Sequence, residues 1–182
     1  MLTKKGAIWV SAVLYLTLGI VAISLILGAA IPLVEKMRDR NTVIQTKNML
    51  FTLDETIRTV ANEGPGSQRE LSPFTVTEGK LVINKADDKI VWNKDTTAII
   101  QEPSTHGNRV VIKEGVISME LKETLVEEKY DMVLTLEYTN IDIDLVSSFA
   151  NPFVGTYTAL IKHTGTFTPL PGNKPIIAII MT

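Results

Sequence analysis

Two histidines are the side chains best suited to metal or acid–base chemistry, and they stand far apart in the sequence. His106 lies among turn residues, and His163 ends an apolar run with the character of a strand. A zinc site would need further Cys, His or carboxylate ligands at short spacings, and the chain has no cysteine. The pattern favours histidines that are exposed or hydrogen-bonded, and it predicts no metal and no cofactor.

The stretch "NIDID" places oxygen-bearing side chains at alternating positions. Asn140, Asp142 and Asp144 would share one side of a strand, where their oxygens could meet calcium. However, no glycine-turned loop and no later bidentate glutamate completes a calcium-loop pattern. The stretch therefore favours a solvated strand face with Ile141 and Ile143 turned inward, and calcium binding is the alternative.

The remaining patterns exclude several classes of function. The sequence has no nucleophile elbow and no phosphate-binding loop. Its net charge is −2, and it has no basic patch with interleaved aromatic residues, so nucleic acid is not an expected partner. We expect a protein that is not an enzyme.

The N-terminal segment accounts for the high hydrophobic content of 45%. Residues 7–34 carry no formal charge and would form a helix about 42 Å long, whereas about 20 residues are enough to span a bilayer. Lys4 and Lys5 precede this run, which places the N-terminus on the cytoplasmic side and the later residues outside. Pro32 predicts a kink near the outer end of the helix.

Three interpretations of this segment compete. A cleaved secretory signal would use the small residues at positions 28–30, but its apolar core should be only about 7–15 residues long. A plain single-pass anchor would keep the whole segment, with an extracellular binding domain that does not assemble. The third interpretation depends on the residues that come directly before the apolar run.

The tripeptide "KKG" directly before a long apolar helix resembles the leader of archaeal type IV pilin-like proteins. In that family a membrane peptidase removes a short basic leader that ends in glycine, and the apolar helix survives to form a filament core. The resemblance implies a leader at residues 1–6 and cleavage between Gly6 and Ala7, with Lys4 and Lys5 holding the site at the cytoplasmic surface. It also implies a prepilin peptidase-like protease and further copies of this chain as partners, in a homopolymeric filament.

Small residues along the apolar helix would let neighbouring copies approach closely. Many family members carry Glu at the fifth position of the mature chain, where this sequence has Ser11. The residues expected to take part in packing within the membrane segment are Ser11, Gly19, Ala22, Gly28, Ala29, Ala30 and Pro32.

Beyond the charged stretch "EKMRDR" the helix is expected to continue to residue 62, where "NEGPG" ends it. An apolar stripe with spacings of 7, 3, 4 and 3 residues predicts a face that packs on a globular domain. The stripe consists of Val43, Leu50, Leu53, Ile57 and Val60. Ile44 and Phe51 lie beside it, which indicates either a wide core face or a second contact line to a neighbouring subunit.

Residues 63–182 read as a β-rich head. "KLVIN" and "KIVWN" flank a four-residue turn and predict a hairpin, and the terminal run "IIAIIM" predicts an interior strand covered on both faces. The expected fold class is α+β, a long N-terminal helix with an antiparallel β-sandwich-like head. The expected function is a structural subunit of an extracellular filament whose head is exposed for surface or adhesion contacts. The alternatives are the anchored binding domain and a secreted enzyme or binding protein.

Overall fold

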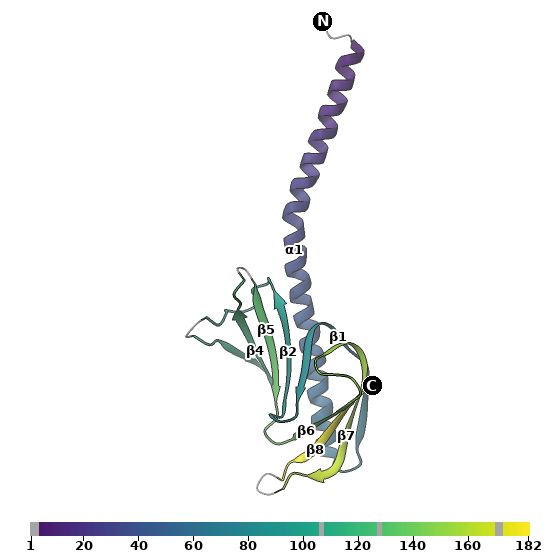
Figure 1. The fold of residues 1–182 in the computed structure, drawn as a ribbon, viewed down its shortest axis with the longest axis vertical. Helices are drawn as coiled ribbons and strands as arrows, with labels where there is room; N and C mark the ends of the chain where they lie inside the picture. The colour runs from purple at the N-terminus through teal and green to yellow at the C-terminus, as the bar shows by residue number, and fades with distance from the viewer. Residues whose placement is uncertain (1–3, 106–107, 127–128, 170–172) are drawn as a thin grey trace. The chain divides into compact units, whose positions relative to one another are not determined.

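The computed structural model describes residues 4–105, 108–126, 129–169 and 173–182, with side chains from residue 9 onward. The chain divides into two compact units, residues 1–38 and residues 39–182. The first unit is described as helix alone, and the second combines the rest of that helix with a sheet (Figure 1). The structure confirms the α+β class, with a long N-terminal helix and a sheet-rich head.

The helix is α1 (Lys4–Glu63), and eight strands follow it within the described residues. The strands are β1 (Gln68–Asn84), β2 (Lys89–Thr96), β3 (Val111–Glu114), β4 (Ile117–Glu123), β5 (Tyr130–Glu137), β6 (Asp142–Ser147), β7 (Phe153–Phe167) and β8 (Pro175–Met181).

All eight strands belong to one sheet in the order β3-β4-β5-β2-β1-β7-β8-β6. Every neighbouring pair is antiparallel except β6 and β8, which are parallel. The predicted hairpin is confirmed, because Leu81 of β1 pairs with Trp92 of β2. The C-terminal run forms β8, which lies between β7 and β6 and buries the consecutive residues Ile177, Ala178 and Ile179.

The first unit consists of an exposed apolar helix. Two of its hydroxyls donate hydrogen bonds within the helix, from Ser24 to the carbonyl of Ile20 at 2.8 Å and from Thr17 to that of Leu14 at 2.9 Å. Internal pairing of this kind suits a helix in lipid, where no water can satisfy a polar group. The helix continues through Pro32. By length and composition it could cross a membrane.

In the second unit, α1 packs on the sheet through the predicted stripe. Val43, Leu50, Leu53, Ile57 and Val60 are each at most 3% exposed and join the strand residues in one hydrophobic core. The inward-facing side chains, which alternate with outward-facing ones along the strands, form the opposite side of this core. The stripe is therefore confirmed as a packing face.

The helix ends where its backbone turns left-handed. Gly64 has φ of +87°, a conformation that costs glycine little. Its amide donates back to the carbonyl of Val60, and the hydroxyl of Ser67 donates to the same carbonyl at 2.8 Å. These bonds satisfy a carbonyl that the helix end would otherwise leave unpaired.

Candidate functional site

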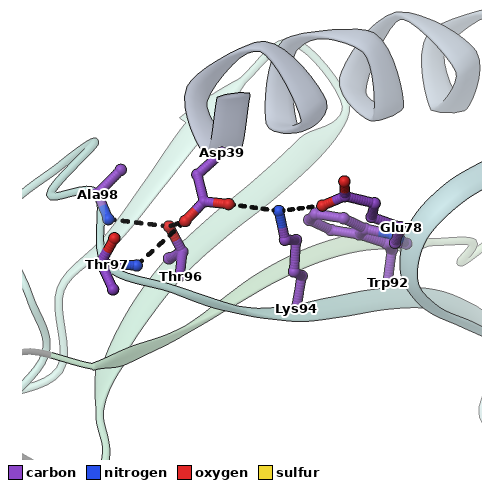
Figure 2. Close-up of polar contacts among 7 residues, drawn as sticks. All are labelled: Asp39, Glu78, Trp92, Lys94, Thr96, Thr97 and Ala98. Carbon is purple, nitrogen blue, oxygen red and sulfur yellow. Dashed lines mark hydrogen bonds and ion pairs between the residues drawn. The ribbon is translucent and has the colours of Figure 1, made fainter. Parts of the chain in front are cut away.

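Two carboxylates converge on Lys94 in the head (Figure 2). Its ammonium nitrogen lies 2.6 Å from Oδ1 of Asp39 and 2.5 Å from Oε2 of Glu78. The three side chains are only 11%, 17% and 21% exposed, in the order Lys94, Asp39, Glu78. One largely buried cation is therefore held between two carboxylates from two other elements.

The position of Lys94 follows from the phase of its strand. In β2, Ile90, Trp92 and Thr96 alternate toward the core and are nearly fully buried, and Lys94 falls in the same phase. A cation at an inward position needs compensating charge, because an unpaired buried charge is very costly. Asp39 and Glu78 supply that charge.

Asp39 belongs to α1 and is the first residue of the second unit. While its Oδ1 meets Lys94, its Oδ2 accepts two hydrogen bonds, from the hydroxyl of Thr96 at 2.8 Å and from the amide of Thr97 at 3.2 Å. The Thr96 hydroxyl oxygen in turn accepts from the amide of Ala98 at 3.0 Å, which leaves its proton directed at Asp39. The end of β2 therefore binds one oxygen of this carboxyl group with two donors.

Glu78 is positioned by a bend in β1. The pairing of β1 shifts register between Val76 and Leu81, and Gly79 within this bend has φ of +79°. A Cβ at Gly79 would lie 2.6 Å from the carbonyl oxygen of Asn93 and 2.7 Å from the ring of Trp92. The Trp92 indole also donates to the main-chain oxygen of Glu78 at 2.9 Å. The bend thus packs directly against Trp92, and this packing fixes the backbone position from which the Glu78 side chain extends.

The electrostatics of the group favour an ionised Asp39. Burial by itself would raise the pKa of this carboxyl, but hydrogen bonds from Lys94, Thr96 and Thr97, with the charge of Lys94, outweigh it and hold the pKa below its ordinary value. The resting group is accordingly an ion pair that joins α1 to β2 and β1. Its parts are an amine, a carboxyl group with two donors on one oxygen, and a second carboxylate within reach of the amine.

No family model, curated protein or solved structure matches this chain.

The residues expected at the leader cleavage site stand at the beginning of the chain. The backbone of Lys4, Lys5, Gly6 and Ala7 is the first turn of α1, and their side chains, like residues 1–3, lie outside the described part. Cleavage between Gly6 and Ala7 stays a prediction.

The residues expected to pack between copies all lie in the first unit. Of these, Ser11, Gly19, Ala22, Gly28, Ala29 and Pro32 are exposed, and Ala30 is half-buried. A Cβ at Gly19 or Gly28 would meet nothing within 4 Å. Both glycines thus leave open space beside the helix that a partner could occupy.

The two residues beside the stripe have different environments. Phe51 is half-buried and packs against the core, with its ring 3.2 Å from where a Cβ at Gly115 would stand. This packing supports the wide core face, and an intersubunit contact at Phe51 stays a prediction. Ile44 is 43% exposed, so the expectation of an intersubunit contact there stays a prediction.

The other candidate ligands are dispersed or used within the head. His163 is 1% exposed, and its Nδ1 accepts the amide of Gly165 at 3.0 Å, so it is a hydrogen-bonded core residue. His106 lies outside the described residues. In "NIDID" the isoleucines turn inward as predicted, with Ile141 and Ile143 at 6% and 0% exposed.

The polar members of that stretch lie in β6 or directly before it. Asp142 and Asp144 lie in β6 and Asn140 is exposed just before it, and Lys85 approaches Asp144 at 3.6 Å. Within the described residues, no group of three His, Asp or Glu side chains could hold a metal ion. The calcium alternative gains no support from this arrangement.

Sequence reasoning missed the Lys94 group. It treated Asp39 only as one of the charges at the end of the apolar run, and it attached no role to Glu78. A signal existed in "KIVWNKDT", because a lysine in phase with Ile90, Trp92 and Thr96 must turn toward the core if the strand is regular. That phase shows that Lys94 needs a partner, but it does not show which carboxylates provide it.

Proposed function

We propose that this chain is a structural subunit of an extracellular type IV pilus-like filament. Its leader would be removed after Gly6, its apolar helix would leave the membrane to pack against other copies, and its head would face outward for surface or adhesion contacts. The role is structural and needs no catalytic turnover on a substrate.

One observation carries this proposal: an apolar helix that the described residues of its own chain do not cover. None of its most apolar 18-residue window is buried by the part of the chain that the structure describes. Lipid or protein must cover such a surface, since exposure to water costs about 25 cal/mol for each Å² of apolar area. "KKG" immediately before this helix supports transfer from lipid to protein, because cleavage there would free the helix from its cytoplasmic anchor.

The decisive experiment is the intact mass and N-terminal sequence of the protein from its native surface fraction, with negative-stain imaging of the same fraction. We expect a chain that begins at Ala7 and appears in filaments. A chain that begins at Met1 or Leu2 would instead support the single-pass anchor with an extracellular binding domain. A chain that begins near Ala30 would indicate ordinary secretion.

A matched pair of variants tests the role of the glycine. Gly6→Leu places a bulky side chain at the cleavage position, and Thr3→Leu places the same side chain elsewhere in the leader. We expect Gly6→Leu to retain the leader and form no filaments, and Thr3→Leu to behave like the wild type. Filaments of uncleaved Gly6→Leu protein would overturn the proposed assembly route.

A further inference from the structure

We propose that Lys94 and Asp39 become joined by an intramolecular amide bond, and that Glu78 carries the proton that this reaction must move. The bond itself does not depend on the filament proposal. It would convert the ion pair of Figure 2 into a covalent link between α1 and β2.

The amine and the carboxyl group already stand in contact. With Nζ of Lys94 only 2.6 Å from Oδ1 of Asp39, the amine needs only a small shift to reach the carboxyl carbon. Holding two reactants at this separation replaces a bimolecular encounter, and well-oriented intramolecular pairs reach effective concentrations of about 10⁵–10⁸ M.

The second oxygen of Asp39 is placed to accept developing charge. When the amine adds to Cγ, negative charge collects on Oδ2, which already receives the Thr96 hydroxyl at 2.8 Å and the Thr97 amide at 3.2 Å. Two fixed donors aimed at one carbonyl oxygen form the arrangement that stabilises tetrahedral intermediates in acyl transfer. Because Ala98 donates to the Thr96 oxygen, the hydroxyl proton needs no reorientation.

Glu78 completes the group as the proton carrier. Its Oε2 lies 2.5 Å from Nζ of Lys94, within the distance at which a general base takes a proton directly. The contacts of Gly79 and Glu78 with Trp92 fix the backbone at Glu78, so its carboxylate already lies beside the amine.

The reaction balances without any added reagent. One proton passes from the Lys94 ammonium to Oδ1 of Asp39, which gives a neutral amine and a carboxylic acid. The amine then forms the Nζ–Cγ bond, Glu78 transfers a second proton from Nζ to Oδ1, and the Cγ–Oδ1 bond breaks to release one water. The amide nitrogen keeps one hydrogen, and Glu78 returns to its carboxylate form.

The neutral pair is a minor form, since Asp39 favours ionisation. It contains the same number of protons as the ion pair, so the ratio between these two forms does not depend on pH. Because only this minor form reacts, we expect the reaction to be slow. Each chain needs to react only once, and the folded head keeps the three groups in contact for as long as the protein exists.

Another lysine in the head shows why this group is singled out. Lys47 also lies 2.6 Å from a carboxylate, that of Glu114, but this glutamate is 49% exposed. Water reaches that pair, and water favours the ion pair over the neutral reactants. The Lys94 group combines three features: low exposure of all three side chains, a second carboxylate as proton carrier, and two donors on the far oxygen of Asp39. Among the described residues, the contact of Lys47 with Glu114 does not combine these features.

The position of the bond suggests its use. Asp39 is the residue at which α1 enters the second unit, so any tension along the chain from the first unit reaches the head there. A covalent link to β2 would stop the helix from peeling off the sheet. This use, unlike the bond, depends on the proposed filament function.

The test is the intact mass of the full chain, purified in detergent and kept folded for several days. We expect a mass lower by one water than that of the same polypeptide calculated from its sequence. Trypsin should fail to cut after Lys94, and the peptide of residues 90–109 should carry the dipeptide Asp39–Arg40. A full mass together with normal cleavage after Lys94 overturns the proposal.

Three variants assign the roles. Lys94→Gln should retain the water completely, and Glu78→Gln should form the bond about 10²–10⁴-fold more slowly, the usual effect of losing a general base. Lys47→Gln removes an equally short ion pair and should lose water as the wild type does. If Glu78→Gln reacts at the wild-type rate, Glu78 is not the proton carrier. A chain that loses water yet starts at Met1 would contradict the filament proposal and leave the amide bond intact.

Discussion

The indole of Trp92 donates a hydrogen bond from Nε1 to the main-chain oxygen of Glu78 at 2.9 Å, while its ring fills the space that a side chain at position 79 would need. One buried aromatic residue thus determines both where β1 bends and where the Glu78 carboxylate begins. The stability of the head and the geometry around Lys94 are linked through this contact.

Replacement of Gly79 tests that link. Gly79→Ala should lower the stability of the head by about 2 kcal/mol or more, because overpacking and a left-handed alanine each cost of order 1–3 kcal/mol. Thermal unfolding followed by circular dichroism would show a lower midpoint. Gly66→Ala is the matched control, because Gly66 also has a positive φ, +91°, but a Cβ there meets nothing within 4 Å. An equal loss in both variants would show that the contact with Trp92 contributes nothing.

Glu120 should stabilise the head at neutral pH. Burial alone would raise the pKa of this carboxyl, but Arg109 and Lys122, with a hydrogen bond from Ser104, hold it below its ordinary value. A carboxyl whose folded pKa is depressed contributes stability above its unfolded pKa, about 4.3 for Glu, and loses it as the pH falls through the folded pKa. Glu120→Gln should therefore lower the unfolding midpoint at pH 7 and leave it unchanged at pH values below the folded pKa of Glu120. A difference that persists at the acid end would indicate a packing effect instead.

Asp131 should have the opposite effect. Burial raises the pKa of its carboxyl, and the neighbouring Asp95 carboxylate raises it further. Since the folded pKa lies above the unfolded value of about 3.9, the folded head loses stability as the pH rises through this range. Asp131→Asn should thus raise the unfolding midpoint at pH 7. The substitution removes the negative charge of a carboxylate whose Oδ1 is buried and has no hydrogen-bond partner among the described residues.

The control for Asp131 removes the same charge from an exposed position. Glu55→Gln, on the exposed face of α1, should change the midpoint at pH 7 little. If both variants stabilise the head equally, the gain comes from net charge and not from the surroundings of Asp131.

The parts of the fold that the sequence predicts are those determined by local periodicity. The stripe from Val43 to Val60, the hairpin of β1 and β2, and the inward isoleucines of "NIDID" each follow from spacings within a short segment. The parallel pairing of β6 with β8 has no such local signal, because alternation places a strand's faces but does not choose its partner.

The Lys94 group shows the same limit at the level of a site. Asp39, Glu78 and Lys94 are distant in sequence and meet only because α1 lies on the sheet and β1 bends at Gly79. The strand phase shows that Lys94 faces inward, whereas its partners depend on tertiary packing. A sequence with no recognisable catalytic motif can thus hold an amine and two carboxylates in contact.

Thr96→Val tests whether the donors on Asp39 act in the proposed amide formation. Thr96 is 3% exposed, and valine nearly reproduces its shape, so the main change is loss of the hydroxyl that donates to Oδ2. Loss of one donor to a developing oxyanion typically slows acyl transfer about 10²–10³-fold. We expect the loss of water, followed by intact mass over days, to slow by that factor in Thr96→Val. Thr56→Val, which removes a buried hydroxyl that donates to the Thr52 carbonyl within α1, should keep the wild-type rate. Equal rates for both variants would mean that the Thr96 hydroxyl serves only to hold the carboxylate in its ion pair.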